Sequence, residues 1–271
     1  MNFIERMRMI MTILNDENYY EKQWEFLSAS QYKGFISCEA KAFAELTGEI
    51  PKENTEAFLV GNYVHSAFES EEVHEKFKQD HEKEMLTKKG KLRAAFIVAE
   101  EMVQRLRQDT FFNELYQGEK EVIITGKLHG EDWKGKIDCL NVEQGYFVDI
   151  KTTADIHKKI WSDSRRLWTP FVEAYGYYEQ MAIYKYLLEK KYEKEFTPYI
   201  IAVSKQTPCD LEAIEIRAEL LIVALNNVKE NIERVSAVKN GEEKPRMCGK
   251  CDYCREHKRL TGFVSSEELI S

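Results

Sequence analysis

The stretch GKIDCLNVEQGYFVDIKT, residues 135 to 152, contains two apolar runs that each lead to charged residues. Asp138 closes the first run, and Asp149 and Lys151 alternate with apolar residues in the second. Successive side chains of a β-strand point to opposite faces, so Asp149 and Lys151 share one face while their apolar neighbours face the core. A hairpin formed by this stretch brings two carboxylates and an ammonium to one end of a sheet.

The sequence around this stretch keeps the same two-residue period. Residues 119–130, 131–142 and 145–153 predict three strands separated by turn residues, which is typical of an antiparallel meander. Residues 196–205 predict a further strand, and residues 211–216 predict another short one. Together they indicate a mixed β-sheet.

Segments with a helical apolar period precede and follow the strands. They are a short segment within 1–27, then 28–47, 55–68, part of 69–91, 91–109, 170–192 and 218–238. Helices around a mixed sheet indicate an α/β fold in a single domain, residues 1–271. We divide it into an N-terminal helical part (about 1–115), a core (about 116–216) and a C-terminal helix with a cysteine-rich tail (about 217–271).

The composition limits the partners of the chain. Lys and Arg number 39 against 47 Asp and Glu, which gives a formal net charge of -8. The molecule as a whole repels polyanions, so binding of nucleic acid requires local basic patches and metal ions. The first residues lack the features of a signal peptide, and no run of about 18 apolar residues occurs. We therefore expect a cytoplasmic protein without a membrane partner.

The charged hairpin suggests a hydrolytic metal site. Asp138 and Asp149 are hard oxygen ligands of the kind that Mg²⁺ and Mn²⁺ prefer. Lys151 beside them would hold a water molecule or assist its deprotonation, while the metal withdraws charge from a phosphate. D-x-K alone is a common tripeptide, but G-x-x-D on the preceding strand and a long helix after it strengthen the pattern.

Four motifs in one order carry a family resemblance. They are GNYVH at 61–65, GKID at 135–138, VDIK at 148–151 and QMAIY at 180–184. This order resembles the RecB-type branch of the PD-(D/E)XK nuclease superfamily, from about Ser28 to Cys254. The resemblance implies a restriction-endonuclease-like core and a metal-dependent deoxyribonuclease.

The resemblance also implies roles for single residues. It makes His65, Asp138, Asp149 and the Ile150 carbonyl metal ligands and Lys151 the catalytic lysine. Gln180 and Tyr184 occupy positions that orient this lysine or contact DNA, and Glu121 is similar in position to a supporting acidic residue.

Cysteines at both ends of the chain extend the resemblance. Cys38, together with Cys248, Cys251 and Cys254, is similar to the arrangement in which four-cysteine nucleases hold a [4Fe-4S] cluster. Zn²⁺ is the competing occupant, and three thiols in a mobile tail are the simplest alternative. Cys139 and Cys209, in or beside strands, are interpreted as buried apolar residues.

Among relatives, the layout resembles prophage RecE-like exodeoxyribonucleases, which degrade double-stranded DNA from its ends for single-strand-annealing recombination. This resemblance implies DNA as substrate, an annealing recombinase as partner and a toroidal homo-oligomer around DNA. One alternative is a CRISPR-adaptation-type nuclease that trims single-stranded ends. The other is a cysteine-stapled module that binds DNA or protein through a degenerate nuclease core.

Residues 154–169 fit neither period. Basic and aromatic side chains alternate there, namely Lys158, Lys159, Trp161, Arg165, Arg166 and Trp168. Such a mixture is suited to contacts with phosphates and bases. An ordered loop with packed tryptophans is the alternative interpretation.

Overall fold

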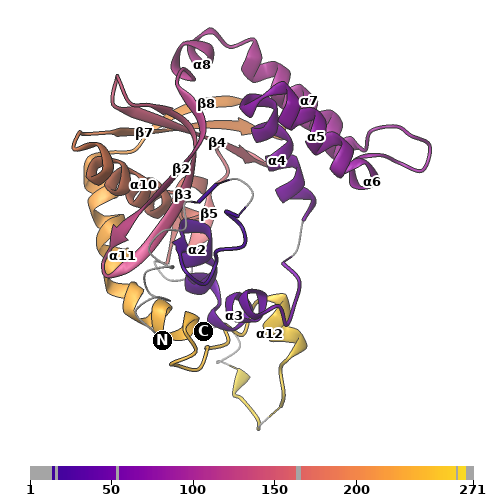
Figure 1. Ribbon diagram of the computed structural model, residues 1–271. Coiled ribbons are helices and arrows are strands. Elements are labelled where there is room, and N and C mark those ends of the chain that lie inside the picture. Colours follow the sequence, from indigo (N-terminus) through magenta and orange to yellow (C-terminus); the bar gives the residue numbers. More distant parts are fainter. Residues whose placement is uncertain (1–13, 16–17, 53–54, 163–165, 261, 267–271) are drawn as a thin grey trace. The chain divides into compact units, whose positions relative to one another are not determined.

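The computed structural model describes residues 14–15, 18–52, 55–162, 166–260 and 262–266 (Figure 1). The chain groups into two compact units, of which the first is Met1–Ala29 with Glu53–Glu230 and the second is Ser30–Lys52 with Asn231–Ser271. Whether they form the expected single domain stays a prediction. The short helix expected within residues 1–27 lies mostly outside the described residues, whose part of this segment consists of turns and the start of a strand.

The first unit contains a six-stranded mixed sheet and a separate two-stranded ribbon. The sheet strands are β1 (Leu27–Ser28), β2 (Glu119–Leu128), β3 (Glu131–Asn141), β4 (Tyr146–Thr153), β7 (Thr197–Ser204) and β8 (Leu211–Glu215), and the ribbon is β5 (Ile160–Ser162) with β6 (Leu167–Thr169). The helices are α4 (Glu56–Glu69), α5 (Glu71–Asp80), α6 (Glu82–Met85), α7 (Ala94–Arg107), α8 (Thr110–Leu115), α9 (Phe171–Ala174), α10 (Tyr177–Tyr192) and the start of α11 (Ala218–Lys239). Among the helices described, none has the length and apolar character that a membrane crossing requires.

The sheet confirms the mixed α/β architecture. β2, β3 and β4 form the predicted antiparallel meander, β7 adds to β4 in parallel, and β8 pairs with β7 in antiparallel. β1 is parallel to β3. Since β2 pairs along almost all of one edge of β3, β1 and β4 share the other edge, at opposite ends of it.

Apolar side chains from both faces of the sheet form the core. Ile150 of β4 is fully buried and belongs to one cluster with Val64 of α4 and Met102 of α7. On the other face, α10 places Tyr184 directly over Gly135 of β3. The strands are therefore covered on both sides, which explains why most residues of β4 are buried, Asp149 included.

The second unit contains α2 (Ala29–Ser37), which starts one residue before it, α3 (Glu39–Thr47), the end of α11 and α12 (Asp252–Glu256). The sequence predicts one helix over 28–47, and this prediction is wrong in one respect. The helix is interrupted at Cys38, which adopts an extended conformation with φ -162° and ψ 106° and is the N-cap residue of α3. Gly48 ends α3 in the left-handed conformation that glycine favours, with φ 75°.

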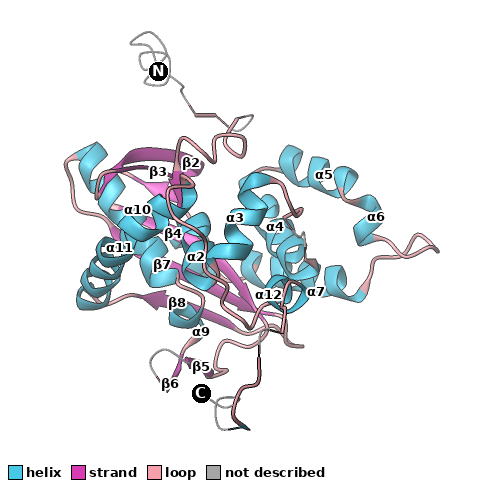
Figure 2. Cartoon of the chain, turned by 90° about the horizontal axis from the view of Figure 1, so that it is seen from below, coloured by secondary structure: helices cyan, strands magenta, loops and turns pink. Residues whose placement is uncertain are grey.

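Two further expectations need correction. The helix predicted over 170–192 is divided into α9 and α10, because Gly176 turns the chain with φ 64°. Residues 154–169 are more than a loop, since β5 and β6 pair within them beside α9 (Figure 2). Arg165, one of the basic residues singled out in this segment, lies outside the described residues.

Candidate active site

The ladder between β3 and β4 stops where the acidic residues begin. Its last pair is Cys139 with Val148, and Asp138 and Asp149 would be the next pair in the same register. The amide of Ile150 instead donates a hydrogen bond to Oδ2 of Asp138, at 2.7 Å. A side chain thus replaces the backbone partner at this point, and the two carboxylates lie at the end of the hairpin as the sequence predicts.

Two more potential ligands approach Asp138. Nδ1 of His65, from α4, lies 3.1 Å from Oδ2 of Asp138. Glu121 lies opposite Asp138 in the register of β2 and β3. One ligand atom from each of these three residues falls within 4.8 Å of the others. Two nearly buried carboxylates and an imidazole at this spacing suit a divalent cation with oxygen and nitrogen ligands.

Glu121 has an unusual backbone. Its φ is 51°, in the left-handed region, although it lies inside a strand and is not a glycine. Such a conformation costs about 1–3 kcal/mol and tends to occur at functional sites. The strained residue is therefore the same one whose carboxylate lies near Asp138.

Asp149 and Lys151 form the second half of the site. Nζ of Lys151 is in ion-pair contact with Oδ2 of Asp149, and Nε2 of Gln180 donates to Oδ1 of Asp149 at 2.8 Å. Both oxygens of this buried carboxylate therefore have a partner, Oδ2 in Lys151 and Oδ1 in Gln180. A carboxylate oxygen has more than one lone pair, so Asp149 could still bind a cation.

Tyr184 and Tyr177 take different places around this pair. Tyr184, which the resemblance assigns to the lysine or the DNA, packs its ring against Gly135. Sequence reasoning missed Tyr177, whose ring centre lies 4.8 Å from Nζ of Lys151. Tyr177 precedes Gln180 and Tyr184 at spacings of three and seven residues, so the helical period was a signal that could have found it.

The electrostatics separate the two aspartates. Burial raises the pKa of Asp149. Burial also opposes the charge of Asp138, but the neighbouring His65 outweighs it and lowers the pKa of Asp138. In turn, Asp138 overcomes the effect of burial and raises the pKa of His65 to about 9. Pairs of carboxyl groups pushed apart in this way are typical of sites that handle protons.

Lys151 and Glu121 are shifted as well. Burial opposes the charge of Lys151, but Asp149 and then Asp138 raise its pKa to about 12. Burial, followed by repulsion from Asp138, raises the pKa of Glu121 to about 7. Before a cation binds, Lys151 is therefore an ammonium at neutral pH and is suited to hold an anionic group rather than to accept a proton.

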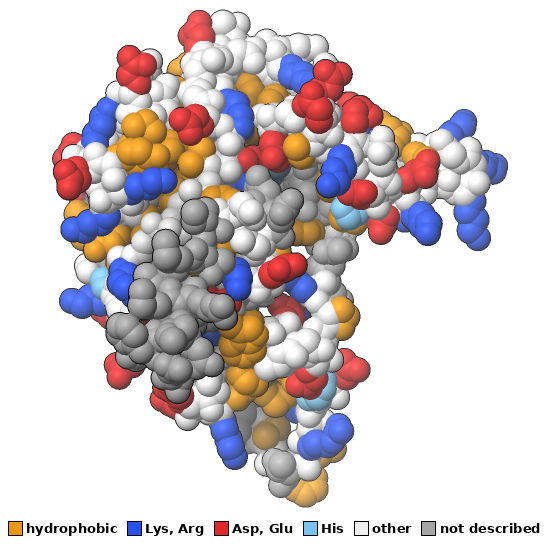
Figure 3. Space-filling view, viewed as in Figure 1, with side chains coloured by type: hydrophobic (Ala, Val, Ile, Leu, Met, Phe, Trp, Pro, Cys, Tyr) orange, Lys and Arg blue, Asp and Glu red, His pale blue; other side chains and the backbone are white. Residues whose placement is uncertain are grey.

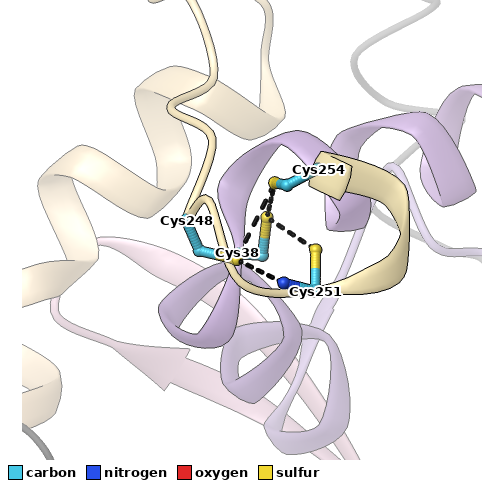
Figure 4. A group of neighbouring side chains, drawn as sticks. All are labelled: Cys38, Cys248, Cys251 and Cys254. Carbon is cyan, nitrogen blue, oxygen red and sulfur yellow. Dashed lines mark hydrogen bonds between the residues drawn. The ribbon is translucent and has the colours of Figure 1, made fainter. Parts of the chain in front are cut away.

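The second unit contains a cluster of four cysteines (Figure 4). Sγ of Cys38 lies 3.5 Å from Sγ of Cys254 and 3.7 Å from Sγ of Cys251, and Sγ of Cys248 lies 3.7 Å from that of Cys254. All four are free thiols, and all four sulfurs fall within 4.8 Å of one another. The four residues predicted to act together are therefore assembled around one point, where they could hold a metal.

The backbone prepares Cys248 to carry a charge. The amides of Lys250 and Cys251 point at its sulfur, at 3.4 and 3.3 Å. Burial opposes the thiolate, but these amides outweigh it and lower the pKa of Cys248 to about 6. The remaining cysteines, Cys139 and Cys209, are buried in the first unit as predicted.

A mixed sheet with acidic residues and a lysine on neighbouring strands defines a PD-(D/E)XK-like domain, and comparison with known proteins agrees. The chain belongs to the family described as PDDEXK-like domain of unknown function (DUF3799), whose sequence model matches residues 28–257. No curated protein is significantly similar to it. The chain is thus a PDDEXK-like protein.

The solved structures that are similar to the chain include two with different sequence identity and coverage. One, from Eubacterium rectale, is named "Putative exonuclease"; it is 35% identical, with 95% of this chain and 98% of that chain covered and a TM-score of 0.87. The other, SSO0001, is 15% identical over 80% of this chain and 90% of that chain, with a TM-score of 0.32.

Proposed function

We propose that the protein is a metal-dependent DNA exonuclease of the RecB-type branch. The observation that carries this proposal is the ion pair of Lys151 with the buried Asp149, next to the potential ligands His65, Glu121 and Asp138. The name of the Eubacterium rectale relative supports the same activity. Hydrolysis of a phosphodiester bond requires a group that stabilises the developing negative charge and a positioned water molecule. These residues are suited to supply both.

Mg²⁺ or Mn²⁺ is the cation that this ligand set fits, with His65, Asp138, Asp149 and the Ile150 carbonyl as ligands. The cation would withdraw charge from the scissile phosphate and acidify a bound water. Lys151 would hold the attacking water or the phosphate oxygen as an ammonium. Gln180 would keep Asp149 in place through its hydrogen bond.

The substrate we propose is the end of double-stranded DNA, digested in phage-type recombination or repair together with a single-strand-annealing recombinase. On the face shown in Figure 3, Lys and Arg side chains are interspersed with Asp and Glu side chains, in line with the net charge of -8. Bulk attraction to DNA is therefore weak. A ring of subunits closed around the duplex would retain the DNA by topology instead.

The decisive experiment replaces Asp149 with Asn, which keeps the size of the side chain and the hydrogen bond from Gln180. We expect Asp149→Asn to lose cleavage of end-labelled duplex in the presence of Mg²⁺ or Mn²⁺. Its thermal unfolding should still be a single cooperative transition, which would show that the variant is folded. Asp132→Asn, on the exposed surface of the same sheet, is the matched control and should cleave normally. Full activity of Asp149→Asn would contradict the proposal.

The choice of substrate distinguishes the alternatives. A duplex labelled at the 5′ or the 3′ end reports polarity, and single-stranded DNA of the same sequence tests the CRISPR-adaptation-type activity. Wild-type protein that binds DNA but cleaves neither substrate with either metal would support the degenerate binding module. The buried and complete set of charged residues favours an enzyme, because an inactive site has no need to hold these charges out of water.

For the four cysteines we propose Zn²⁺ rather than a [4Fe-4S] cluster. A zinc ion binds thiolates at about 2.3 Å, which sets tetrahedral sulfurs about 3.8 Å apart. In a [4Fe-4S] cluster each thiolate binds a separate iron, so the sulfurs are about 6 Å apart. The three Sγ distances of 3.5, 3.7 and 3.7 Å support the single ion.

Metal analysis of protein purified without oxygen tests this choice. We expect about one zinc per chain and a colourless solution, and Cys254→Ser should lose the zinc. Arg105→Ala, in the first unit, should retain it. A brown protein with several irons per chain and absorbance near about 400 nm would establish the cluster instead.

A further inference from the structure

A cavity of about 330 Å³ lies where β4 leaves the sheet and the chain enters the β5–β6 ribbon. Every residue that lines it belongs to the first unit. Its walls combine three aromatic and two basic side chains, which are Trp161, Trp168, Tyr175, Lys158 and Lys159. The nuclease chemistry described above does not use any of these five residues.

The aromatic side chains are unusually exposed. Trp161, Trp168 and Tyr175 expose 48%, 60% and 51% of their surface. The two tryptophans are a directly opposed pair in the ribbon, with ring centres 5.5 Å apart at an angle of 71°. Opposed residues of a strand pair point to the same face, so both rings stand on one side of the ribbon. An exposed cluster of large aromatic side chains is costly in water and indicates a binding surface.

The charges around these rings are those that a phosphate chain requires. Lys158 and Lys159 precede β5 and are exposed at the cavity. Asp155 also lines the cavity, but its Oδ1 accepts a hydrogen bond from the amide of His157 at 2.9 Å. Aromatic faces next to lysines are the combination with which proteins bind single-stranded nucleic acid: bases stack on the rings and cations track the backbone.

The cavity is connected to the candidate active site through two elements. Along β4, Asp149, Lys151 and Thr153 share one face, and Thr153 lines the cavity about 7 Å beyond Lys151. At the break before α10, Tyr175 lines the cavity and its ring centre lies 6.1 Å from that of Tyr177, the ring beside Lys151. One strand of nucleic acid can therefore occupy both places.

We propose that this cavity binds an unpaired stretch of the DNA strand next to the bond to be cleaved, with bases stacked on Trp161, Trp168 and Tyr175 and phosphates near Lys158 and Lys159. This proposal rests on the nuclease function proposed above and specifies it further. It makes single-stranded DNA, or the frayed end of a duplex, the species that binds in this cavity. Sequence preference is not expected, because every base has a face that can stack.

Binding to a labelled oligothymidylate of about ten nucleotides tests the proposal, with EDTA present so that no cleavage occurs. We expect Trp168→Ala to weaken binding about fivefold or more, and Trp168→Phe to retain most of the affinity. Trp24→Ala removes a tryptophan that is 48% exposed elsewhere in the first unit and should bind like wild type. Unchanged binding by both Trp161→Ala and Trp168→Ala would overturn the proposal.

A second variant guards against unfolding of the ribbon. The double variant Lys158→Gln and Lys159→Gln leaves the aromatic pair intact and should lower the slope of log affinity against log salt by about one. An unchanged slope would contradict the phosphate contacts. Wild type that binds the oligonucleotide through these residues but never cleaves DNA would overturn only the nuclease function, whereas cleavage without such binding would overturn only the cavity.

Discussion

Glu121 lowers the local stability of the fold while it contributes a carboxylate to the candidate site. Its left-handed backbone is strained, and its carboxylate lies near Asp138, with Lys136 at 3.1 Å and His65 as cationic neighbours. Burial and the neighbouring carboxylate favour its neutral form, which is why the pKa rises to about 7. In the absence of a cation, the folded protein therefore has to protonate this group or accept a repulsive charge.

Glu121→Gln should stabilise the metal-free protein at alkaline pH. The folded pKa lies above that of the unfolded chain, so wild type loses stability as pH rises from about 4.5 to about 7, and the variant does not. We expect the variant to gain about 1–3 kcal/mol at pH 8 in EDTA and to gain much less at pH 5. Urea unfolding at both pH values measures the difference.

Glu119→Gln is the control, because it removes an exposed carboxylate from the same strand. Its unfolding free energy should follow wild type at both pH values. The same two variants also test ligation: calorimetric titration with Mn²⁺ should be weaker for Glu121→Gln only. Equal stability of wild type and Glu121→Gln at pH 8 would show that the carboxylate carries no penalty.

At the scale of elements, the contact of α10 with β3 fixes the position of Gln180. The glycine of the GKID motif permits this contact. A Cβ on Gly135 would lie 2.5 Å from Cε1 of Tyr184, closer than packed atoms approach. Tyr184 is buried and packed, so its ring has little room to yield. Close packing against Tyr184 thus explains why a glycine occupies position 135. The same packing holds Gln180 against Asp149.

Gly135→Ala should therefore push α10 away from the sheet. We expect a loss of about 1–3 kcal/mol in unfolding free energy from overpacking, together with reduced cleavage because Gln180 is displaced. Gly61→Ala is the matched control, because a Cβ there would meet its nearest atom at 3.7 Å inside a helix. That variant should be neutral or slightly stabilising. Equal denaturant midpoints for Gly135→Ala and wild type would show that α10 does not depend on this contact.

On the scale of the whole molecule, the chain places its two candidate metal sites in different units. The carboxylate site lies in the first unit, which has the large apolar core, and the thiolate site lies in the second. The second unit is much the smaller of the two, and the buried cluster of Cys38, Ala40 and Cys254 lies at the thiolate site. Small units commonly depend on a bound metal for part of their stability.

Removal of the metal that we propose for the four cysteines should consequently unfold the second unit first. We expect Cys254→Ser, or treatment with a strong zinc chelator, to produce a new calorimetric transition at lower temperature while the main transition of the first unit is retained. Asp149→Asn serves as the control, because it changes only the carboxylate site in the first unit. A single transition that shifts as a whole would contradict this division of stability.

Sequence by itself determined the sheet meander, the alternation of side chains along β4 and the presence of Asp138, Asp149 and Lys151 at one end of a hairpin. These features are local, because the two-residue period fixes which side chains share a face of a strand. The cysteine assembly was predicted only by resemblance. Neither spacing nor period could join Cys38 to Cys254, which is 216 residues away along the chain.

Only the tertiary structure decided how these pieces meet. It broke the first helix at Cys38 so that the thiol reaches its partners, turned Glu121 into a left-handed conformation, and brought His65 to Asp138. It also divided the helix at Gly176 and exposed the tryptophan pair. Each of these outcomes depends on contacts between distant segments, whose packing energy outweighs the local preference of one or two residues for a continuous helix or strand.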